Sequence, residues 1–426
     1  MSTTTPHQKM MIPRRPFGSA LNNPNLPATV PILSLGCSSF STFFWTKDEV
    51  ELSSASSSSS WTCDQLDRNH EIVREWIATI HYCTDHGMTL WDTAPWYGHG
   101  TSEVVVGWAL EELVGRGVER KDLCINTKVG RYEADPTQQF DFSREMVLKS
   151  VKRSLTRLKT EYIDVLQLHD PEFAPSLSQL MDETIPAMLE CRKQGWCRAL
   201  GMTGYPLEVQ HQLLQVTLEK FPDQATKIWD QALTYGHFNL HNTSLLTRPI
   251  DPTSGTDISY GDYIDSQGMG LLAAAPLSMG LLTHSKPPNW HPASEKLEQA
   301  CQVAADYASQ HKVNLATVAI LFAMSDPRIP STILGIKDRD QAKQAVEMAN
   351  RFDAIDTTKI TRDEVLAKIL TDDEHQVVQY LLKSDQSPFH GLEATGDFRW
   401  DGVACVREFW KQVETVQDQK WQVSIK

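Results

Sequence analysis

Eight short apolar segments, separated by stretches with helical periodicity, constrain the fold of this 426-residue chain more than any other feature. The segments lack the polar–apolar alternation of half-exposed strands, which is typical of parallel strands covered by helices. Eight strand–helix units are the number that closes a barrel. We therefore predict an α/β fold, a (β/α)8 TIM barrel. The apolar segments span residues 31–36, 88–94, 122–129, 163–170, 198–204, 228–235, 270–276 and 331–336.

The stretches between these segments carry recognisable helix boundaries. One amphipathic stretch ends at Gly87, a residue type that often follows the last helical turn. Ser102 is expected to cap the next helix, with a glutamate directly behind it. Ser143 is expected to begin a third helix, in which basic residues gather toward the C-terminus and so suit the helix dipole. Regular alternation of strand and helix favours a parallel α/β arrangement.

The two ends of the chain and one insertion fall outside this repeat. Residues 1–30 show no periodicity and are expected to form a flexible arm. The barrel is expected to span 31–350 with loop insertions, of which the Ser-rich segment 46–69 is expected to be a disordered surface loop. Residues 351–426 contain a helical stretch at 361–384. They are expected to be a C-terminal extension packed on the barrel, because a segment of this length is too short to form a second hydrophobic core easily.

Composition limits the classes of partner. Lys and Arg number 40 against 54 Asp and Glu, so the net charge of −14 disfavours nucleic acid and anionic membrane surfaces. There is no apolar run of about 18 residues and no apolar signal core at the N-terminus, so we expect a cytoplasmic protein. None of the eight cysteines forms a C-x-x-C pair, and reduced thiols are expected. No metal is expected, since the histidines of 237–241 lack a third ligand nearby. The oligomeric state is left open.

Four polar residues follow consecutive predicted strands. Asp92 ends the second strand, Tyr97 follows it, Lys128 lies in the third strand and His169 ends the fourth. In barrels of this type the catalytic residues lie at the C-terminal ends of the strands. We therefore expect these four side chains to meet around one mouth of the barrel.

The chemistry of the four residues is coherent. Transfer of a hydride to or from a carbonyl carbon needs a proton donor or acceptor at the oxygen. A tyrosine has an ordinary pKa of about 10, and a nearby ammonium favours its phenolate. A buried aspartate would keep Lys128 charged, and His169 could orient the carbonyl or share the proton. The pattern predicts an oxidoreductase.

The strings GMTLWDTAPWYGHGTSE, TKVG, LQLHDP and ALGMTGY closely resemble the aldo-keto reductase superfamily, over about residues 31–350. The resemblance implies that Tyr97 is the general acid/base, that Lys128 lowers its pKa, and that Asp92 pairs with Lys128. It implies that His169 orients the substrate. Trp96, beside Tyr97, is the best candidate for an aromatic wall against a sugar ring.

Within the superfamily, TKVGRY, YIDVLQLHDPEF and APLSMGLLT are most similar to sugar dehydrogenases that act on L-galactose or D-arabinose. Such enzymes oxidise the anomeric carbon of a free aldose to the aldonolactone, usually with NAD. The resemblance therefore implies an NAD(P)-dependent aldose 1-dehydrogenase with a small-molecule substrate. Two alternatives stay open: an NADPH-dependent reductase of aldehydes or ketones, and a cofactor-binding regulatory subunit with little catalysis.

The resemblance also implies that a nicotinamide dinucleotide, NAD or NADP, binds across the barrel mouth. The similarity to the sugar dehydrogenases favours NAD. Thr203 and Gly204 stand where relatives carry a Ser-Asn pair that holds the carboxamide, so Gly204 removes one side-chain hydrogen bond. Ala274 stands where many relatives stack a tyrosine on the nicotinamide. The pyrophosphate path is expected along Pro276, Leu277, Ser278 and Gly280. The adenosine end is expected near Gly335, Lys337, Arg339 and Gln341.

Overall fold

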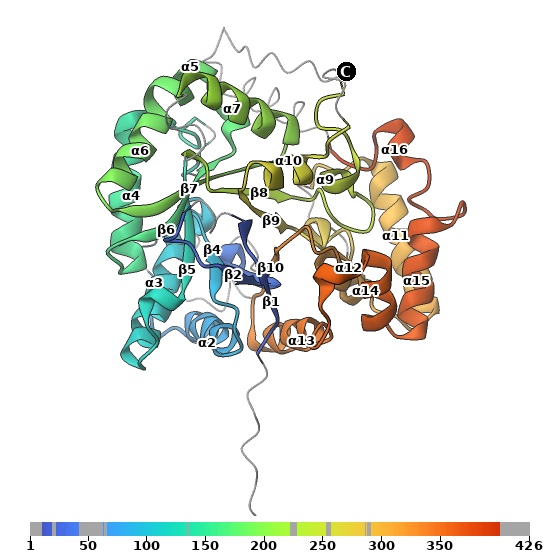
Figure 1. Cartoon of the computed structure of the whole chain (residues 1–426). Coiled ribbons are helices and arrows are strands. Elements are labelled where there is room, and N and C mark those ends of the chain that lie inside the picture. Colours follow the sequence, from blue (N-terminus) through green and yellow to red (C-terminus); the bar gives the residue numbers. More distant parts are fainter. Residues whose placement is uncertain are drawn as a thin grey trace, which may run out of the picture.

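The core of the protein is a closed barrel of parallel strands surrounded by helices (Figure 1). Every predicted strand is present, and the predicted (β/α)8 barrel is confirmed. The strands are β3 (Leu33–Gly36), β4 (Leu90–Asp92), β5 (Cys124–Val129), β6 (Ile163–His169), β7 (Cys197–Gly204), β8 (Gln231–Tyr235), β9 (Gly270–Ala274) and β10 (Ser331–Gly335). They follow one another around the barrel in chain order, and β10 closes on β3. The computed structural model describes residues 11–18, 23–41, 63, 66–133, 135, 137–221, 228–252, 257–285, 287 and 291–400.

Helices cover the outside of the barrel, and the last of them packs beside the first. They are α2 (Glu71–Asp85), α3 (Thr101–Gly115), α4 (Arg144–Leu158), α5 (Leu177–Gln179), α6 (Ile185–Lys193), α7 (Leu207–Lys220), α9 (Ser244–Thr247), α10 (Tyr260–Ser266), α11 (Glu295–Gln310), α12 (Leu315–Ser325) and α13 (Arg339–Asn350). The contact between α13 and α2 completes the outer ring of helices. The ring buries the apolar outer faces of the strands.

The two predicted helix caps have different outcomes. Ser143 caps α4, and its hydroxyl accepts a hydrogen bond from Met146 N, as predicted. The predicted Ser102 cap is wrong, because α3 begins at Thr101 and its N-cap is Gly100, with a φ of 100° that suits glycine. The Ser102 hydroxyl is buried and donates to Cys37 O at 2.8 Å. It therefore ties α3 to the loop after β3.

Side chains inside the barrel form layers, because alternate residues of each strand point inward. The lowest layer is apolar and includes Leu90, Cys124, Val165 and Leu272. Polar side chains follow on three of these strands: Asp92 on β4, Asn126 and Lys128 on β5, and Gln167 and His169 on β6. The interior thus changes from apolar at the N-terminal ends of the strands to polar at their C-terminal ends.

Part of the predicted flexible arm forms regular structure. β1 (Arg14–Pro16) pairs antiparallel with β2 (Thr29–Pro31), and Phe17, Leu26 and Val30 pack on the lowest barrel layer. The expectation of an irregular arm over 1–30 is therefore wrong for this described part, because burial of three apolar side chains stabilises a segment that has no periodicity of its own. Residues 1–10 and 19–22 lie outside the described part of the chain.

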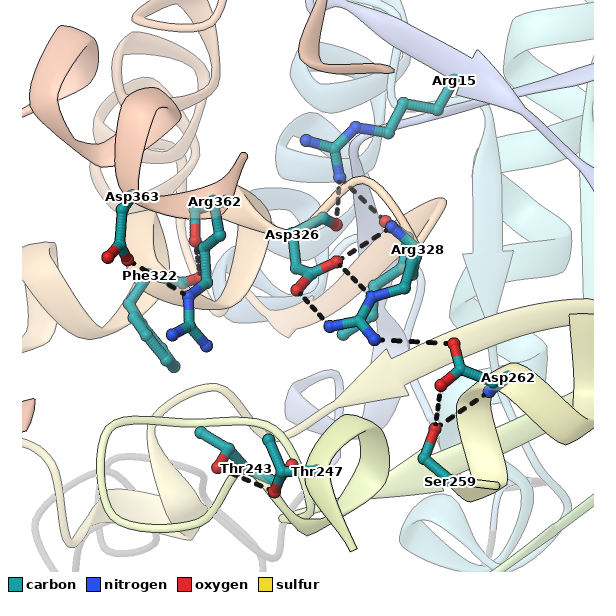
Figure 2. A network of polar contacts seen from close by, with 12 residues as sticks. Arg15, Thr243, Thr247, Ser259, Asp262, Phe322, Asp326, Arg328, Arg362 and Asp363 are labelled. Carbon is teal, nitrogen blue, oxygen red and sulfur yellow. Dashed lines mark hydrogen bonds and ion pairs between the residues drawn. The ribbon is translucent and has the colours of Figure 1, made fainter. Parts of the chain in front are cut away.

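Arg15 anchors this hairpin to the barrel. Its side chain is 3% exposed. It donates to the backbone carbonyls of Asp326 and Ile329 at 3.0 and 2.8 Å, and to Met324 O at 2.6 Å. Figure 2 shows Arg15 reaching Asp326, whose carboxylate binds Arg328 on its other side.

We expect Arg15→Ala to lower the free energy of unfolding by about 2–4 kcal/mol, because buried carbonyls would lose their donors. The exposed neighbour Arg14 gives a matched control, and Arg14→Ala should cost about 1 kcal/mol or less. Urea denaturation measures both. Equal effects of the two substitutions would mean that the hairpin is not anchored through Arg15.

The residues after α13 pack against the outside of the barrel domain as far as α16 (Leu392–Thr395), and residues 398–400 then reach the C-terminal ends of the strands, where the Trp400 ring stacks on Tyr205 with centroids 4.5 Å apart. The helical stretch predicted at 361–384 is two helices, α14 (Arg362–Ile369) and α15 (Asp372–Lys383), each opened by a Thr–Glu capping box. α14 contacts α12 and α15 contacts α11 (Figure 1). The short helix α16 follows. Residues 401–426 and most of the Ser-rich segment 46–69 lie outside the described residues. Among the described residues, no helix combines the length and apolarity needed to span a bilayer.

Candidate active site

The structure brings together the four polar residues that the sequence singled out. Asp92 is the last residue of β4, Lys128 lies near the end of β5, and His169 ends β6. Asp92 pairs with Asn126, two residues before Lys128, and Lys128 pairs with Gln167, two residues before His169, so the three side chains point to the same side of neighbouring strands. All three side chains are buried. Tyr97 begins the 3-10 helix η5 (Tyr97–Gly100) directly above β4.

An ion pair lies at the base of this cluster. The ammonium of Lys128, 1% exposed, donates to Asp92 Oδ2 at 2.7 Å and to Thr93 O at 2.8 Å. Asp92 Oδ1 accepts from Gln167 Nε2 at 2.8 Å. Burial alone would lower the pKa of Lys128, but attraction to Asp92 and Tyr97 outweighs burial and the net pKa is raised. Lys128 is therefore held charged and fixed in direction.

Tyr97 lies between the lysine and the histidine. The Lys128 Nζ atom is 4.6 Å from the centroid of the Tyr97 ring. The His169 ring stands edge-on to it, with centroids 6.2 Å apart. Burial raises the pKa of Tyr97 to about 12, while Lys128 acts in the opposite direction, as predicted. In the protein alone burial outweighs the lysine, so the phenol is protonated at neutral pH.

His169 is neutral in this environment. Burial lowers the pKa of His169 well below its usual value, and the charges of Lys128 and Arg131 act in the same direction. Its Nε2 lies 3.7 Å from Asp170 Oδ2, and its Nδ1 has no hydrogen-bond partner among the described residues. A neutral imidazole with an unpartnered nitrogen is suited to bind a hydroxyl or carbonyl group of a ligand.

Further polar residues, which the sequence pattern did not single out, lie around the cluster. Gln167 points inward two residues before His169, so the two-residue period of the strand could have identified it. Asp170 and Glu172 follow His169 directly in LQLHDPEF, and both are buried. Arg131 donates to Asp170 Oδ2 at 2.8 Å. These residues place two buried carboxyl groups and one guanidinium next to the predicted catalytic residues.

Trp96, the predicted substrate wall, is half-buried beside Tyr97. The guanidinium carbon of Arg131 lies 3.8 Å from the centroid of its ring. One face of the indole is therefore covered by a cation instead of being open to a sugar ring.

The predicted nicotinamide and pyrophosphate residues lie at the same end of the barrel as the cluster. Thr203 and Gly204 end β7, next to His169 on β6. The loop after β9 turns through positive φ at Ser278, Met279 and Gly280 (49°, 51° and 107°). Ser278 is buried, and its hydroxyl contacts His241 Nε2 at 2.7 Å. Pro276 and Leu277 open the same loop.

The predicted adenosine residues surround the N-terminus of α13. Gly335 is exposed at the end of β10, and the Lys337 backbone N–H donates to Gln341 Oε1 at 3.0 Å. The Arg339 guanidinium is already paired, because its Nη2 lies 2.8 Å from Glu75 Oε2 on α2. The structure therefore brings all the predicted cofactor residues to one rim of the barrel.

Two cavities lined by described residues are at the opposite, N-terminal end of the barrel, one of them between Asn23, Arg198 and Asp230, and a third lies between the loop after β8 and the C-terminal helices. Barrel enzymes carry their chemistry at the C-terminal ends of the strands, so the polar cluster is the better candidate site. Among the described residues, no group of three or more His, Cys, Asp or Glu side chains is arranged to hold a metal ion.

Known proteins are similar to this chain in fold and in sequence. The sequence profile of the Aldo/keto reductase family matches residues 73–363. L-galactose dehydrogenase of Arabidopsis thaliana is 33% identical over 291 residues, which cover 68% of this chain and 83% of the relative. D-arabinose 1-dehydrogenase of Saccharomyces cerevisiae is 31% identical over 270 residues, which cover 63% of this chain and 74% of the relative. A holo-form aldo-keto reductase structure from Bacillus halodurans matches 88% of this chain and 99% of its own with a TM-score of 0.56 and 21% identity, which indicates a shared fold. The chain belongs to the aldo/keto reductase family.

Proposed function

We propose that this protein is an NAD(P)-dependent aldose 1-dehydrogenase that oxidises a free aldose, of the L-galactose or D-arabinose type, to the aldonolactone. The observation that carries the proposal is the position of the Tyr97 phenol, between the charged Lys128 and the neutral His169. The two sugar dehydrogenases among the relatives support the choice of an aldose.

In this reaction the anomeric carbon loses a hydride, and its hydroxyl group loses a proton, so that a lactone carbonyl forms. A bound nicotinamide dinucleotide supplies the acceptor for the hydride. Tyr97 takes the hydroxyl proton onto its phenolic oxygen. Lys128 stabilises the phenolate that accepts this proton, and Asp92 keeps Lys128 charged and in place. His169 orients the sugar hydroxyl through its ring nitrogen.

The residues at the strand ends fit a nicotinamide dinucleotide. The positive φ values at Ser278, Met279 and Gly280 allow backbone to approach a ligand closely. α13 is long enough to present a full first turn of backbone N–H groups, which attract phosphate oxygens. The buried Thr203 lies one strand away from His169. On this fit we assign Thr203 and Gly204 to the nicotinamide end of the cofactor and the loop after β9 to its pyrophosphate.

We favour NAD over NADP at the adenosine end. Arg339 is the guanidinium that could bind a 2′-phosphate, and Glu75 holds it with contacts of 2.8–3.0 Å. The Asp338 side chain caps α13 next to it. Two carboxylates beside the only arginine of this turn disfavour a second phosphate and suit a ribose hydroxyl.

A substrate screen tests the proposed function. Purified protein would be supplied with NAD or NADP and a panel of free aldoses, and formation of the reduced cofactor would be followed by absorbance. We expect turnover of at least one aldose, with a higher kcat/KM for NAD than for NADP. Cofactor binding without turnover of any aldose or carbonyl compound would contradict the proposal and support a regulatory subunit.

The pKa of Tyr97 favours a second candidate, a reductase of aldehydes or ketones. Because burial raises this pKa to about 12, the phenol at neutral pH is ready to donate a proton, which reduction requires. Comparison of initial rates in both directions separates the two functions. Faster reduction of simple aldehydes than oxidation of any aldose would favour the reductase.

A further inference from the structure

The carboxyl group of Glu172 occupies the space beside Gly204, at the end of β7. A Cβ atom built on Gly204 would lie 2.6 Å from Glu172 Oε2, closer than any real contact allows. Glu172 is 3% exposed, so its carboxyl group lies inside the protein beside Gly204. The chain therefore places a carboxyl group where another residue at position 204 would place its own side chain.

Only one of the two Glu172 oxygens is partnered. Oε1 accepts a hydrogen bond from the backbone N–H of Tyr205 at 2.9 Å. Oε2 is buried and has no hydrogen-bond partner among the described residues. A buried polar atom without a partner is costly, and in native proteins it is often satisfied by a ligand or a water molecule.

The surroundings favour the neutral acid. Burial, together with the negative charge of Asp170, raises the pKa of Glu172 to about 8, although Arg131 acts in the opposite direction. In a neutral carboxylic acid, one oxygen is a carbonyl acceptor and the other carries a proton. Oε1 already accepts from Tyr205, so Oε2 is the oxygen that carries the proton. The missing partner is therefore a hydrogen-bond acceptor.

We infer that Glu172, as a neutral acid, donates a hydrogen bond from Oε2 to the carbonyl oxygen of the nicotinamide carboxamide, in place of the side chain that Gly204 lacks. Glu172 lies three residues after His169, so it belongs to the reacting end of the bound cofactor. The carboxamide is the polar substituent of the nicotinamide ring. This inference rests on the proposed function, because it needs a nicotinamide at the ends of β6 and β7.

Two substitutions at residue 172 separate this role from a structural one. Glu172→Gln keeps an oxygen for Tyr205 N–H and presents an N–H donor at the position of Oε2. Glu172→Ala removes both. We expect the alanine variant to bind NAD about tenfold more weakly than wild type, the value of one hydrogen bond, and the glutamine variant to stay within about twofold. Isothermal titration calorimetry on the full chain measures the Kd without any turnover, and circular dichroism checks that the variants fold.

A cofactor analogue that lacks the carboxamide provides the matched ligand control. Wild type and Glu172→Ala should bind this analogue with equal Kd, because the group that Glu172 contacts is gone. Gly204→Ala is a third variant. Its methyl group would push the carboxyl group aside, so it should weaken NAD binding as Glu172→Ala does.

The outcomes are distinguishable. An alanine variant that binds NAD as tightly as wild type, or a glutamine variant as weak as the alanine variant, would overturn the inference while leaving the proposed function intact. A raised KM for the sugar with an unchanged Kd for NAD would also overturn it, since Glu172 would then contact the substrate. If wild type binds neither NAD nor NADP, the proposed function fails and the inference fails with it.

Discussion

Tyr97→Phe should lower kcat by about 10²–10⁴-fold in whichever direction the enzyme is assayed, because it removes the atom that exchanges a proton with the substrate. The substitution keeps the ring, and with it the packing against His169 and Lys128. The Kd for NAD should therefore change little. Stopped-flow or steady-state assays of reduced-cofactor absorbance measure the rate, and calorimetry measures the binding.

Tyr260→Phe is the matched control for this experiment. Tyr260 is fully buried on α10, and its hydroxyl donates to Gln210 Oε1 at 2.9 Å. Loss of this hydroxyl costs one buried hydrogen bond and removes no contact with Asp92, Tyr97, Lys128 or His169. Its kcat should stay near the wild-type value. Wild-type turnover in Tyr97→Phe would show that the proton passes through another group.

Lys128→Met should reduce both activity and stability. Without the ammonium, the pKa of Tyr97 should rise further, and kcat should fall by about a hundredfold or more. In the oxidation direction the pH profile of the residual rate should be shifted to higher pH than in wild type, because the Tyr97 phenolate forms at higher pH. The free energy of unfolding should fall by about 3–5 kcal/mol, because the buried Asp92 would lose its ion-pair partner.

A double variant separates these two effects. Lys128→Met with Asp92→Asn removes the unpaired charge and leaves an amide oxygen for Gln167 Nε2. Urea denaturation should show most of the lost stability recovered, while kcat stays as low as in the single variant. Recovery of activity together with stability would mean that Lys128 acts only by holding the fold together.

Local sequence signals predicted the framework of the fold. The eight apolar segments each coincide with a strand of the barrel to within a few residues, and the Ser143 cap begins α4 as expected. These signals work because periodicity and cap preference depend on residues a few positions apart. The prediction that Ser102 caps α3 was wrong because both Gly100 and Ser102 are residue types that can precede a helix. The hydrogen bond of Ser102 to Cys37, far away in the chain, places Ser102 inside the helix and leaves Gly100 as the N-cap.

The candidate site was predictable in its members but less so in its properties. Asp92, Tyr97, Lys128 and His169 could be named because strand ends and residue types are visible in the sequence. Glu172 could not be given a role, because its significance depends on the empty space at Gly204, on another strand. The net pKa of Tyr97 depends on burial, which outweighs the effect of the neighbouring lysine.

The sequence alone determined the number and order of the strands, and it predicted the end of the barrel that carries chemistry and the residues that could move a proton. Tertiary structure alone decided that β1 and β2 pair and that Phe17, Leu26 and Val30 pack on the other end of the barrel, with Arg15 bound to carbonyls more than 300 positions away. It also decided which buried polar atoms have partners. The physical reason is range: helix and strand preferences are set by neighbours in the chain, whereas burial and hydrogen-bond partnership depend on segments that only folding brings together.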